Sequence, residues 1–563
     1  MKRLRWQIAV VLATLVIVAV LLFSQQPVIA PTQPQAAPGG VYTEALIGSL
    51  GRLNPLLDWN NPADRDVNRL IFSGLMKFDA HGLPQPDLAE SWGASADGTI
   101  YNFTLRANAV WHDGTPVTSD DVIFTIDLIK TSSFYPQDIK DLWNKIDVKK
   151  LNDHNLKFTL PEPFAPFLDY VTFGVLPRHL LNSTPPEQLA NADFNIRPVG
   201  TGPYKFDHFI IGGNGQATGV VLTHNDSYYG QKPFISQVVF RYYPDSKTAF
   251  DAYKQGEVLG ISQLTPDILP QALLEPALSV YTSGLPEMSI ILFNLKNNEV
   301  QFLQNANVRR ALMLGLNRDY LVSAFLHGQA IIADGPIMPG SWAHYDGVEH
   351  IGYDPDAAVA LLKSEGYVIP ATGGTVRSKD NESLVLNLVH PDDALHTQIA
   401  QAIQQQWALI GVQVNLQAVP YDQIVSDYLG PRTYQAALVD LNTARTPDPD
   451  PYPFWHQAEA TGGQNYSQWD NRAASEYLEQ ARTETDFTIR ARLYRNFQVV
   501  FAKELPSLPL YYPVYSYGVD AQVRGLQTAP LLYDTSDRLA FIEDWYVVTR
   551  RALEQTPQPT VGP

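Results

Sequence analysis

The stretch LVLNLVHPDDALHTQIAQAIQQQWALIGVQVNLQAV, residues 384–419, predicts the fold class. It begins with an aliphatic run typical of a buried strand and ends with apolar and polar side chains in alternation, as in a half-buried strand. Between the two, Ile399, Ile403 and Trp407 recur at helical spacing, and Gly411 supplies a helix stop. The stretch is a predicted β-α-β unit, and alternation of this kind indicates an α/β layer architecture.

The segments around this unit continue the same alternation. Phe497 and Phe501 share one face of a later helix, and Gly328 would close an earlier one. The first third of the chain differs, because 99–117 and 155–164 show short strands separated by turn residues. We therefore expect a mostly β portion ahead of the α/β portion. The further elements predicted by periodicity are strands over 289–297 and 434–442 and helices over 307–328 and 490–503.

Composition narrows the class of protein. The chain has 563 residues, more than one hydrophobic core usually organises, and 45% of them are hydrophobic, so two or three domains are expected. There are 58 acidic and 40 basic residues, and no basic run occurs beyond the N-terminus, so a nucleic-acid partner is not expected. The chain has no cysteine, which excludes disulfides, thiolate metal sites and lipid attachment through an N-terminal cysteine.

The N-terminus predicts export. The basic start MKRLRWQ precedes an uninterrupted apolar run over 8–23, an arrangement that leaves the rest of the chain outside the cytoplasm. The best cleavage site, residues 28–30, is followed by Pro31, which makes a poor signal peptidase substrate. We therefore expect residues 1–24 to remain as an anchor in the cytoplasmic membrane, with a cleaved signal peptide as the alternative. An extracytoplasmic localisation follows in either case.

Two segments have too little apolar surface to join a core. Residues 25–40 are rich in proline, glutamine and alanine, and we expect them to form an extended spacer. Residues 550–563 are predicted to be a flexible tail. The sequence between these two segments is the predicted globular body.

The search for catalytic and cofactor motifs is negative. Phosphate-loop, zinc-protease, nucleophile-elbow, calcium-loop and dinucleotide patterns are all missing, so no cofactor and no metal site are predicted. The stretch VGTGPYKF, 199–206, lacks the helix that a phosphate loop feeds and is predicted to be a turn leading into a strand. His112 is predicted to be a turn residue, and Asp120 and Asp121 fit a helix N-cap and first turn. We expect the protein not to be an enzyme.

One stretch carries a specific resemblance. YNFTLRANAVWHDGTPVTSDDVIFTIDLI, 101–129, resembles the signature of the family 5 extracellular solute-binding proteins, the peptide and nickel receptors of ABC importers. The shared pattern is W-x-D-G-x-P-x-T-x-x-D-V. Further segments match in order between about 41 and 547: 53–92 with its close PDLAESW, PVGTGPYKF at 198–206, NVRRALMLGLNRDYLV at 307–322, PDPDPYPFW at 447–455, NYSQWDN at 465–471 and ELPSLPLYYP at 504–513.

The resemblance implies a two-lobed, periplasmic-binding-protein-like α/β fold of class II type. Carried onto this chain, lobe one would be 41–288 plus 512–549, with an extra subdomain near 76–199. Lobe two would be 289–506, joined to lobe one by a hinge of two strands.

The resemblance also implies a function. The protein would capture peptides or a related oligomeric solute in the interlobe cleft and deliver it, as a monomer, to ABC permease and ATPase subunits. The alternatives are the same fold binding an oligosaccharide or an anionic solute, a sensory protein of this fold, or a secreted hydrolase whose carboxylates converge in a cleft.

Six residues are expected to line the cleft on this resemblance. For the aromatic ones the alternative is a core or rim position, and for Asp448 it is that the carboxylate orders the proline-rich turn. The six residues are Asn294, Trp342, Tyr345, Arg445, Asp448 and Tyr466.

Arg445 is a departure from the family pattern. Counted back from Asp448 without a gap, Arg445 stands where peptide-binding members carry the aspartate that pairs with the ligand's α-amine. An arginine cannot bind an ammonium group, but its planar fork suits a carboxylate, a phosphate or a pair of sugar hydroxyls. This weakens the expectation of an ordinary free-amine peptide. The alternative is a local gap that makes Arg445 a solvated loop residue.

Overall fold

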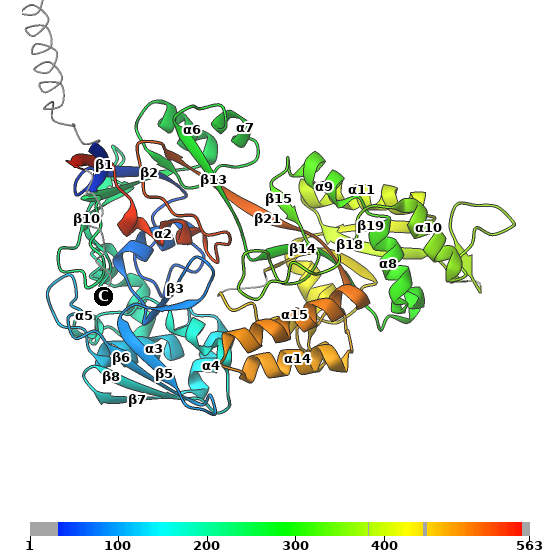
Figure 1. Cartoon of the computed structure of the whole chain (residues 1–563), viewed down its shortest axis with the longest axis horizontal. Helices are drawn as coiled ribbons and strands as arrows, with labels where there is room; N and C mark the ends of the chain where they lie inside the picture. The colour runs from blue at the N-terminus through cyan, green and yellow to red at the C-terminus, as the bar shows by residue number, and fades with distance from the viewer. Residues whose placement is uncertain (1–31, 381, 443–446, 554–563) are drawn as a thin grey trace, which may run out of the picture.

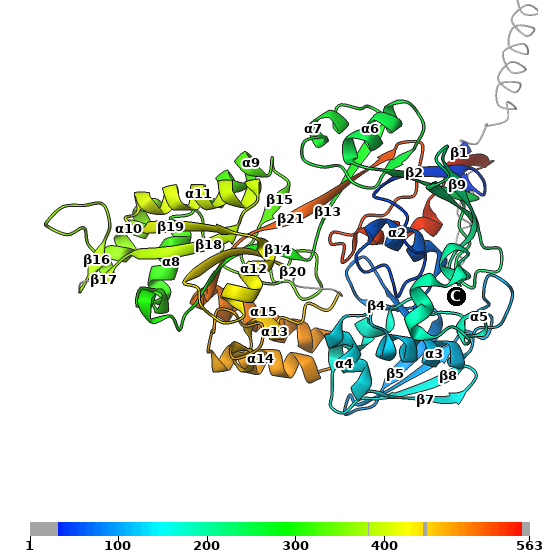
Figure 2. The same ribbon diagram turned by 180° about the vertical axis from the view of Figure 1, so that it is seen from behind.

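The structure is a computed structural model that describes residues 32–380, 382–442 and 447–553. Two lobes lie side by side, and strands run from one into the other (Figure 1, Figure 2). The described residues form a 12-stranded sheet with the order β19-β18-β20-β14-β21-β12-β2-β11-β10-β9, to which β13 and β15 add through β21. These strands are β2 (Val41–Ile47), β9 (Tyr204–Ile211), β10 (Ala217–His224), β11 (Gln237–Tyr243), β12 (Gly260–Ile261), β13 (Leu278–Gly284), β14 (Glu287–Phe293), β15 (Ala330–Ile332), β18 (Val385–Pro391), β19 (Gln413–Val419), β20 (Ala436–Asn442) and β21 (Ser507–Asp520).

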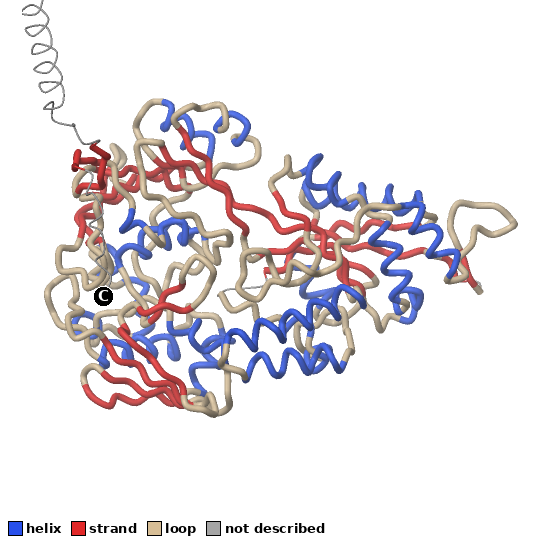
Figure 3. Tube along the Cα trace, in the orientation of Figure 1, coloured by secondary structure: helices blue, strands red, loops and turns tan. Residues whose placement is uncertain are grey.

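Two strand connections join the lobes. The chain crosses first between β13 and β14, at 284–287, and a second time within β21. The first part of β21 pairs with β14, and its last part, from Val514 to Asp520, pairs with β13. Figure 3 shows these strands as the continuous link between the two lobes. The predicted two-lobed fold with two connecting strands is confirmed.

In lobe two, hydrophobic cores pack against both faces of the sheet. Alternate residues of β14 face different cores, with Ile291 and Phe293 on one side and Ile290 and Leu292 on the other, because successive side chains of a strand point to opposite faces. The β-α-β prediction is confirmed, since β18 and β19 are parallel neighbours joined by α11 (Ala394–Leu409). The other helices of lobe two are α8 (Ala306–Leu314), α9 (Arg318–Phe325), α10 (Pro355–Ser364), α12 (Tyr421–Gln423), α13 (Tyr452–Trp455), α14 (Arg472–Thr483) and α15 (Phe487–Glu504).

The single helix predicted over 307–328 is wrong. The chain forms α8 and α9, which are separated at Gly315. The Asn317 side chain caps the second helix by accepting from the Tyr320 N–H, and an asparagine competes with a continuous helix in this way. Periodicity alone did not reveal the break, because Leu312 and Leu321 are buried in the same core.

Lobe one carries the predicted β-rich subdomain, a four-stranded sheet in the order β5-β6-β8-β7. The capping box of α3 is formed by Thr118 and Asp121, so the expectation of an N-cap and first turn at 118–121 is confirmed. The elements of lobe one outside the long sheet are β3 (Met76–Phe78), β4 (Pro84–Pro86), β5 (Ala89–Ala94), β6 (Ile100–Leu105), β7 (Asp147–Asn152), β8 (Asn155–Thr159), α2 (Pro62–Ile71), α3 (Ser119–Thr131), α4 (Gln137–Lys145), α5 (Arg178–Leu181), α6 (Ser246–Lys254), α7 (Leu269–Ala272) and the 3₁₀ turns η1 (Ala165–Val171) and η7 (Thr535–Leu539).

The VGTGPYKF stretch is the turn before β9, as expected, and it binds the WHDGTP loop. His112 accepts from the Gly200 N–H through Nδ1 at 3.2 Å, and its Nε2 contacts the Gly202 carbonyl at 3.1 Å. The glycines let this turn pack closely against the backbone at the end of α2. A Cβ at Gly200 would lie 1.9 Å from the Ile71 carbonyl oxygen. Neither glycine has a positive φ. Glycine is therefore required here because a side chain would not fit, and not because the backbone is left-handed.

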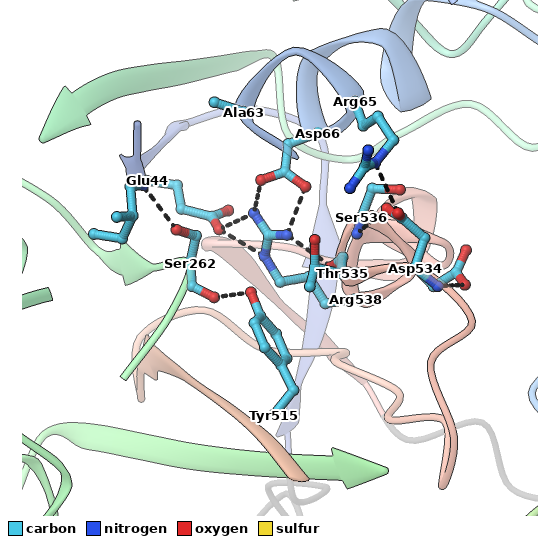
Figure 4. A network of polar contacts seen from close by, with 12 residues as sticks. Glu44, Ala63, Arg65, Asp66, Ser262, Tyr515, Asp534, Thr535, Ser536 and Arg538 are labelled. Atoms are coloured by element: carbon cyan, nitrogen blue, oxygen red, sulfur yellow. Dashed lines mark hydrogen bonds and ion pairs between the residues drawn. The ribbon is translucent and has the colours of Figure 1, made fainter. Parts of the chain in front are cut away.

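A buried arginine fixes α2 and η7 against β2. Arg538 donates to the Glu44 carboxylate and, through two nitrogens, to both oxygens of Asp66, at 2.7–2.9 Å (Figure 4). All three side chains are almost fully buried. A buried charge is tolerated only when it is paired and hydrogen-bonded, so this network determines where α2 lies.

The two ends of the body meet in space. β1 (Thr32–Ala37) pairs antiparallel with β22 (Val548–Leu553), so these parts of the predicted spacer and tail are strands. Residues 1–31, with the predicted anchor, and 554–563 lie outside the described residues. No helix among the described residues has the length and apolar character needed to cross a membrane.

Candidate functional site

An open pocket of about 510 Å³ lies where the two lobes face each other. Its size falls within the range of small-molecule sites. Most of its wall comes from lobe one, from α2 and its flanking loops, from the β3–β4 region and from the segment around η7. Lobe two contributes Asn442, at the end of β20, and Pro447.

The loop before α2 places an acid and an aromatic ring on this wall. Asp58 is 8% exposed, and its Oδ2 accepts from the Asn68 side-chain amide at 2.8 Å. Trp59 packs edge-on against Tyr135, with ring centroids 5.0 Å apart. All four residues line the pocket.

Arg65 holds this loop in place. Its Nη1 donates to the backbone carbonyls of Asp58 and Trp59, at 3.2 and 2.7 Å, and its Nε pairs with Asp534 at 2.7 Å. Figure 4 shows Arg65 reaching from α2 towards Asp534 beside η7. The Asp58 side chain is therefore set in position before any ligand arrives.

The charge balance of the wall is acidic. Burial raises the pKa of the Asp58 carboxyl to about 7, against the opposing effects of the Asn68 hydrogen bond and of Arg65. Burial also raises the pKa values of Asp87, Asp537 and Glu543, which line the same pocket. Perturbed carboxyl groups in a concave site are typical of functional surfaces.

Asp448, one of the predicted ligand contacts, is engaged inside lobe two. Its Oδ2 pairs with Arg490 of α15 at 2.5 Å, and both side chains are almost fully buried. Its backbone N–H donates to the Asp169 carboxylate of lobe one at 2.5 Å. The carboxylate does not form part of the pocket wall, in keeping with the alternative that it orders the proline-rich turn.

Trp342 and Tyr345 lie on the same side of lobe two as Asp448. The Arg490 guanidinium lies 5.0 Å from the centre of the Trp342 ring, so the structure brings Trp342 and Asp448 together through Arg490. Tyr345 contacts α15 through its backbone N–H, which donates to Gln498 at 3.3 Å. Neither aromatic residue is on the pocket wall.

Asn294 and Tyr466 form a second group. The Asn294 amide donates to the carbonyls of Arg432 and Tyr434, at 2.9 and 3.0 Å, and its oxygen accepts from Gln468 at 2.8 Å. The Arg432 guanidinium lies 4.8 Å from the Tyr466 ring centre. Arg445 lies outside the described residues. That these residues contact ligand stays a prediction.

Sequence motifs alone did not predict the wall residues Asp58, Trp59 and Asn68. They belong to the segment 53–92, which resembles the family's opening segment. A usable signal was present, because the loop between β2 and α2 joins a strand of the central sheet to a helix, and such loops carry ligand contacts in α/β folds.

The lobes also touch beside the pocket. The Arg482 guanidinium of α14 lies 5.8 Å from the Phe164 ring centre, next to η1 of the lobe-one subdomain. Both ribbon views show α14 facing the subdomain (Figure 1, Figure 2). Among the described residues, no group of three or more His, Asp or Glu side chains is arranged to hold a metal ion.

Comparison with known proteins fits this geometry. Residues 84–465 match the bacterial extracellular solute-binding proteins, family 5. The dipeptide-binding protein of Escherichia coli is 24% identical over 474 residues, which cover 79% of this chain and 84% of that protein. The oligopeptide-binding protein AppA of Bacillus subtilis is 24% identical over 514 residues, 90% and 91% of the two chains.

A solved structure gives the same result. NikZ from Campylobacter jejuni, in complex with Ni(L-His), aligns with a TM-score of 0.64 at 26% identity and covers 90% of this chain and 99% of NikZ. The family match spans more than half of this chain, and the two-lobed architecture agrees with it. The protein belongs to the family 5 bacterial extracellular solute-binding proteins.

Proposed function

We propose that this protein is the extracytoplasmic receptor of an ABC importer. It captures a short peptide or a related oligomeric solute between its lobes and delivers it to a permease driven by ATPase subunits. It works as a monomer and is tethered to the cytoplasmic membrane by its N-terminal segment.

The observation that carries this proposal is the interlobe pocket of about 510 Å³, which has walls from both lobes. The chain passes between the lobes through two strand connections, and connections of this kind permit hinge closure. Closure excludes water and strengthens the polar contacts made to a bound solute. The named relatives support the ligand class, since two of them bind a dipeptide or an oligopeptide by name and NikZ holds nickel with histidine.

The protein is proposed to bind without turnover. The residues on the pocket wall are held by structural partners, as Asp58 is by Asn68 and Asp534 by Arg65. Capture and release by lobe motion need no reaction. A receptor of this kind leaves its ligand chemically unchanged.

The test is a thermal-shift screen of the full chain in detergent, followed by tryptophan fluorescence. The compounds are di- to pentapeptides, their N-acetylated forms, oligosaccharides and small dicarboxylates. A bound solute raises the melting temperature by mass action, about 2.7 kcal/mol of added stability at a concentration 100 times Kd. Failure of every compound to raise the melting temperature would overturn the proposal.

Two further measurements complete the test. Small-angle scattering with a bound compound should give a smaller radius of gyration than without it, because the lobes close. Chromatography of the peptide after long incubation should recover it intact. Recovery of fragments would favour the hydrolase alternative.

A further inference from the structure

The pocket wall of lobe one holds two hydrogen-bond acceptors without a donor. Asn68 uses its amide N–H on Asp58, and its own Oδ1 is buried with no partner among the described residues. The Oδ1 of Asp58 likewise has no hydrogen-bond or ion-pair partner in the described part of the chain. The two residues are 3% and 8% exposed, and both line the pocket. A buried acceptor such as Asn68 Oδ1 is costly unless a donor satisfies it.

Two aromatic rings border the same acceptors. Trp59 follows Asp58 directly, and Tyr135 packs against it at 88° between the ring planes. Both rings line the pocket. The face of a tryptophan or tyrosine attracts a cation, and the attraction grows when the cation is desolvated.

Among the described residues, no cationic side chain makes a hydrogen bond or an ion pair with these acceptors. Arg65 is nearest in the chain, but it is bound to two backbone carbonyls and to Asp534 and makes no hydrogen bond to the Asp58 carboxylate. Arg538 is likewise paired with Glu44 and Asp66. Within the described residues, the Asp58 carboxylate is therefore left without an ion pair.

Lobe two offers no competing carboxylate in its D-P-D segment. Asp448 is paired with the buried Arg490. Asp450 is paired with Arg482 through both of its oxygens, at 2.7–3.1 Å. A cationic group of a ligand would therefore meet the unpaired carboxylate of Asp58 on the lobe-one side of the pocket.

We infer that the ligand's ammonium or guanidinium group binds on lobe one, donating to Asp58 Oδ1 and Asn68 Oδ1 beside the rings of Trp59 and Tyr135. This inference deepens the proposed function and rests on it for the identity of the site, since it assigns the cationic end of the same solute. The pre-set position of the loop, held by Arg65, keeps the ordering cost of binding low.

The electrostatics agree with this geometry. Burial raises the pKa of Asp58, and the nearby charge of Arg65 and the Asn68 hydrogen bond offset this rise only in part. An ammonium group at Oδ1 would favour the charged form of the carboxyl, and a neutral group would not.

The first test uses n-propylammonium chloride as the probe, with potassium chloride at equal ionic strength as the control for an inorganic cation. At pH 8 we expect propylammonium to raise the melting temperature of the full chain more than potassium does. Asp58→Asn should abolish the difference, and Asp267→Asn, which removes an exposed charge on the same lobe, should keep it. An equal effect of the two salts, or a difference that survives in Asp58→Asn, overturns the inference.

The second test uses tri-L-alanine and its N-acetylated form. Asp58→Asn and Asn68→Ala should each weaken tri-alanine binding about 10- to 100-fold, the range for hydrogen bonds to charged groups, and acetylation should do the same in the wild type. A crystal of the full chain with propylammonium should show it within hydrogen-bonding distance of both oxygens.

The two proposals fail separately. If acetylated and free tri-alanine bind equally and Asp58→Asn changes neither, the ammonium site is wrong while the receptor function stands. If no solute binds but propylammonium distinguishes wild type from Asp58→Asn, the site stands and the receptor function fails.

Discussion

The backbone N–H of Asp448, in lobe two, donates to the side chain of Asp169, in lobe one, at 2.5 Å. The same Asp448 is paired through its carboxylate with Arg490 of α15. The D-P-D segment is thus fixed to a helix on one side and touches the lobe-one subdomain on the other. A family landmark in the sequence is a point of contact between the lobes.

Replacing Asp169 should loosen this contact. Asp169→Ala removes the acceptor of the buried Asp448 N–H, and an unsatisfied buried donor costs about 1–3 kcal/mol. We expect a larger radius of gyration in scattering without ligand and a weaker apparent affinity for solute. Asp193→Ala, an exposed change in the same subdomain, is the control. An unchanged radius of gyration in Asp169→Ala would show that the contact does not influence lobe opening.

Gly200 should not tolerate a side chain. A Cβ there would lie 1.9 Å from the backbone oxygen of Ile71, which the chain cannot clear by moving a side chain. We expect Gly200→Ala to lower the free energy of unfolding by at least the 1–3 kcal/mol typical of overpacking, measured by urea titration. Gly213→Ala meets nothing within 4 Å and should change little. Similar midpoints for the two variants would contradict the close-approach explanation.

Removing Arg538 should destabilise lobe one strongly. Arg538→Met leaves Glu44 and Asp66 buried without a counter-charge, and breaking a buried ion pair in this way costs about 3–5 kcal/mol. The measurement is the urea midpoint at neutral pH. Arg472→Met, which removes an exposed arginine paired with Glu476 and Glu479, should leave the midpoint unchanged. An Arg538→Met midpoint equal to that of Arg472→Met would refute the role given to the network in Figure 4.

Asp58 should make the unliganded protein less stable as the pH rises. Its folded pKa of about 7 exceeds the ordinary aspartate value, so the folded state binds more protons than the unfolded state between about pH 4 and 7. The contribution of Asp58 to stability therefore falls through this window and is least above pH 7. At pH 5 the melting temperatures of wild type and Asp58→Asn should differ less than at pH 8, because at pH 5 Asp58 is ionised in the unfolded state but still neutral in the folded state.

At pH 8 Asp58→Asn should be the more stable of the two, by at most about 4 kcal/mol, since each pKa unit corresponds to about 1.4 kcal/mol. Asp267→Asn controls for the loss of one charge. The check is the melting temperature of the three proteins from pH 5 to 8 without added amine. A constant difference between Asp58→Asn and wild type over this range would show that the Asp58 carboxyl titrates normally.

The sequence predicted the fold well where local pattern and tertiary packing agree. Ile399, Ile403 and Trp407 are buried as their spacing indicated, because a 3.6-residue repeat leaves only one face for the sheet. The same rule missed the break at Gly315, where a cap at Asn317 restarts the helix without disturbing the apolar face.

Prediction of the site was less complete. The predicted contacts came from lobe two, and one of them, Asn294, has its side-chain amide satisfied within that lobe. The pocket wall came chiefly from lobe one. Asp58 and Asn68 are ten positions apart in the sequence, and nothing in the sequence says that Asn68 donates to Asp58 and leaves one oxygen of each without a donor.

The sequence by itself determined the α/β class, the order of the elements and the family, because periodicity, turn residues and motif order are local properties of the chain. The tertiary structure decided which charges are paired and which are not. Asp448 and Asp58 are both acids in family landmarks, yet Asp448 pairs with Arg490, and among the described residues the Asp58 carboxylate accepts a hydrogen bond from the Asn68 amide alone. That difference depends on which elements pack together, because a buried charge is stabilised only by the partners that the fold brings to it.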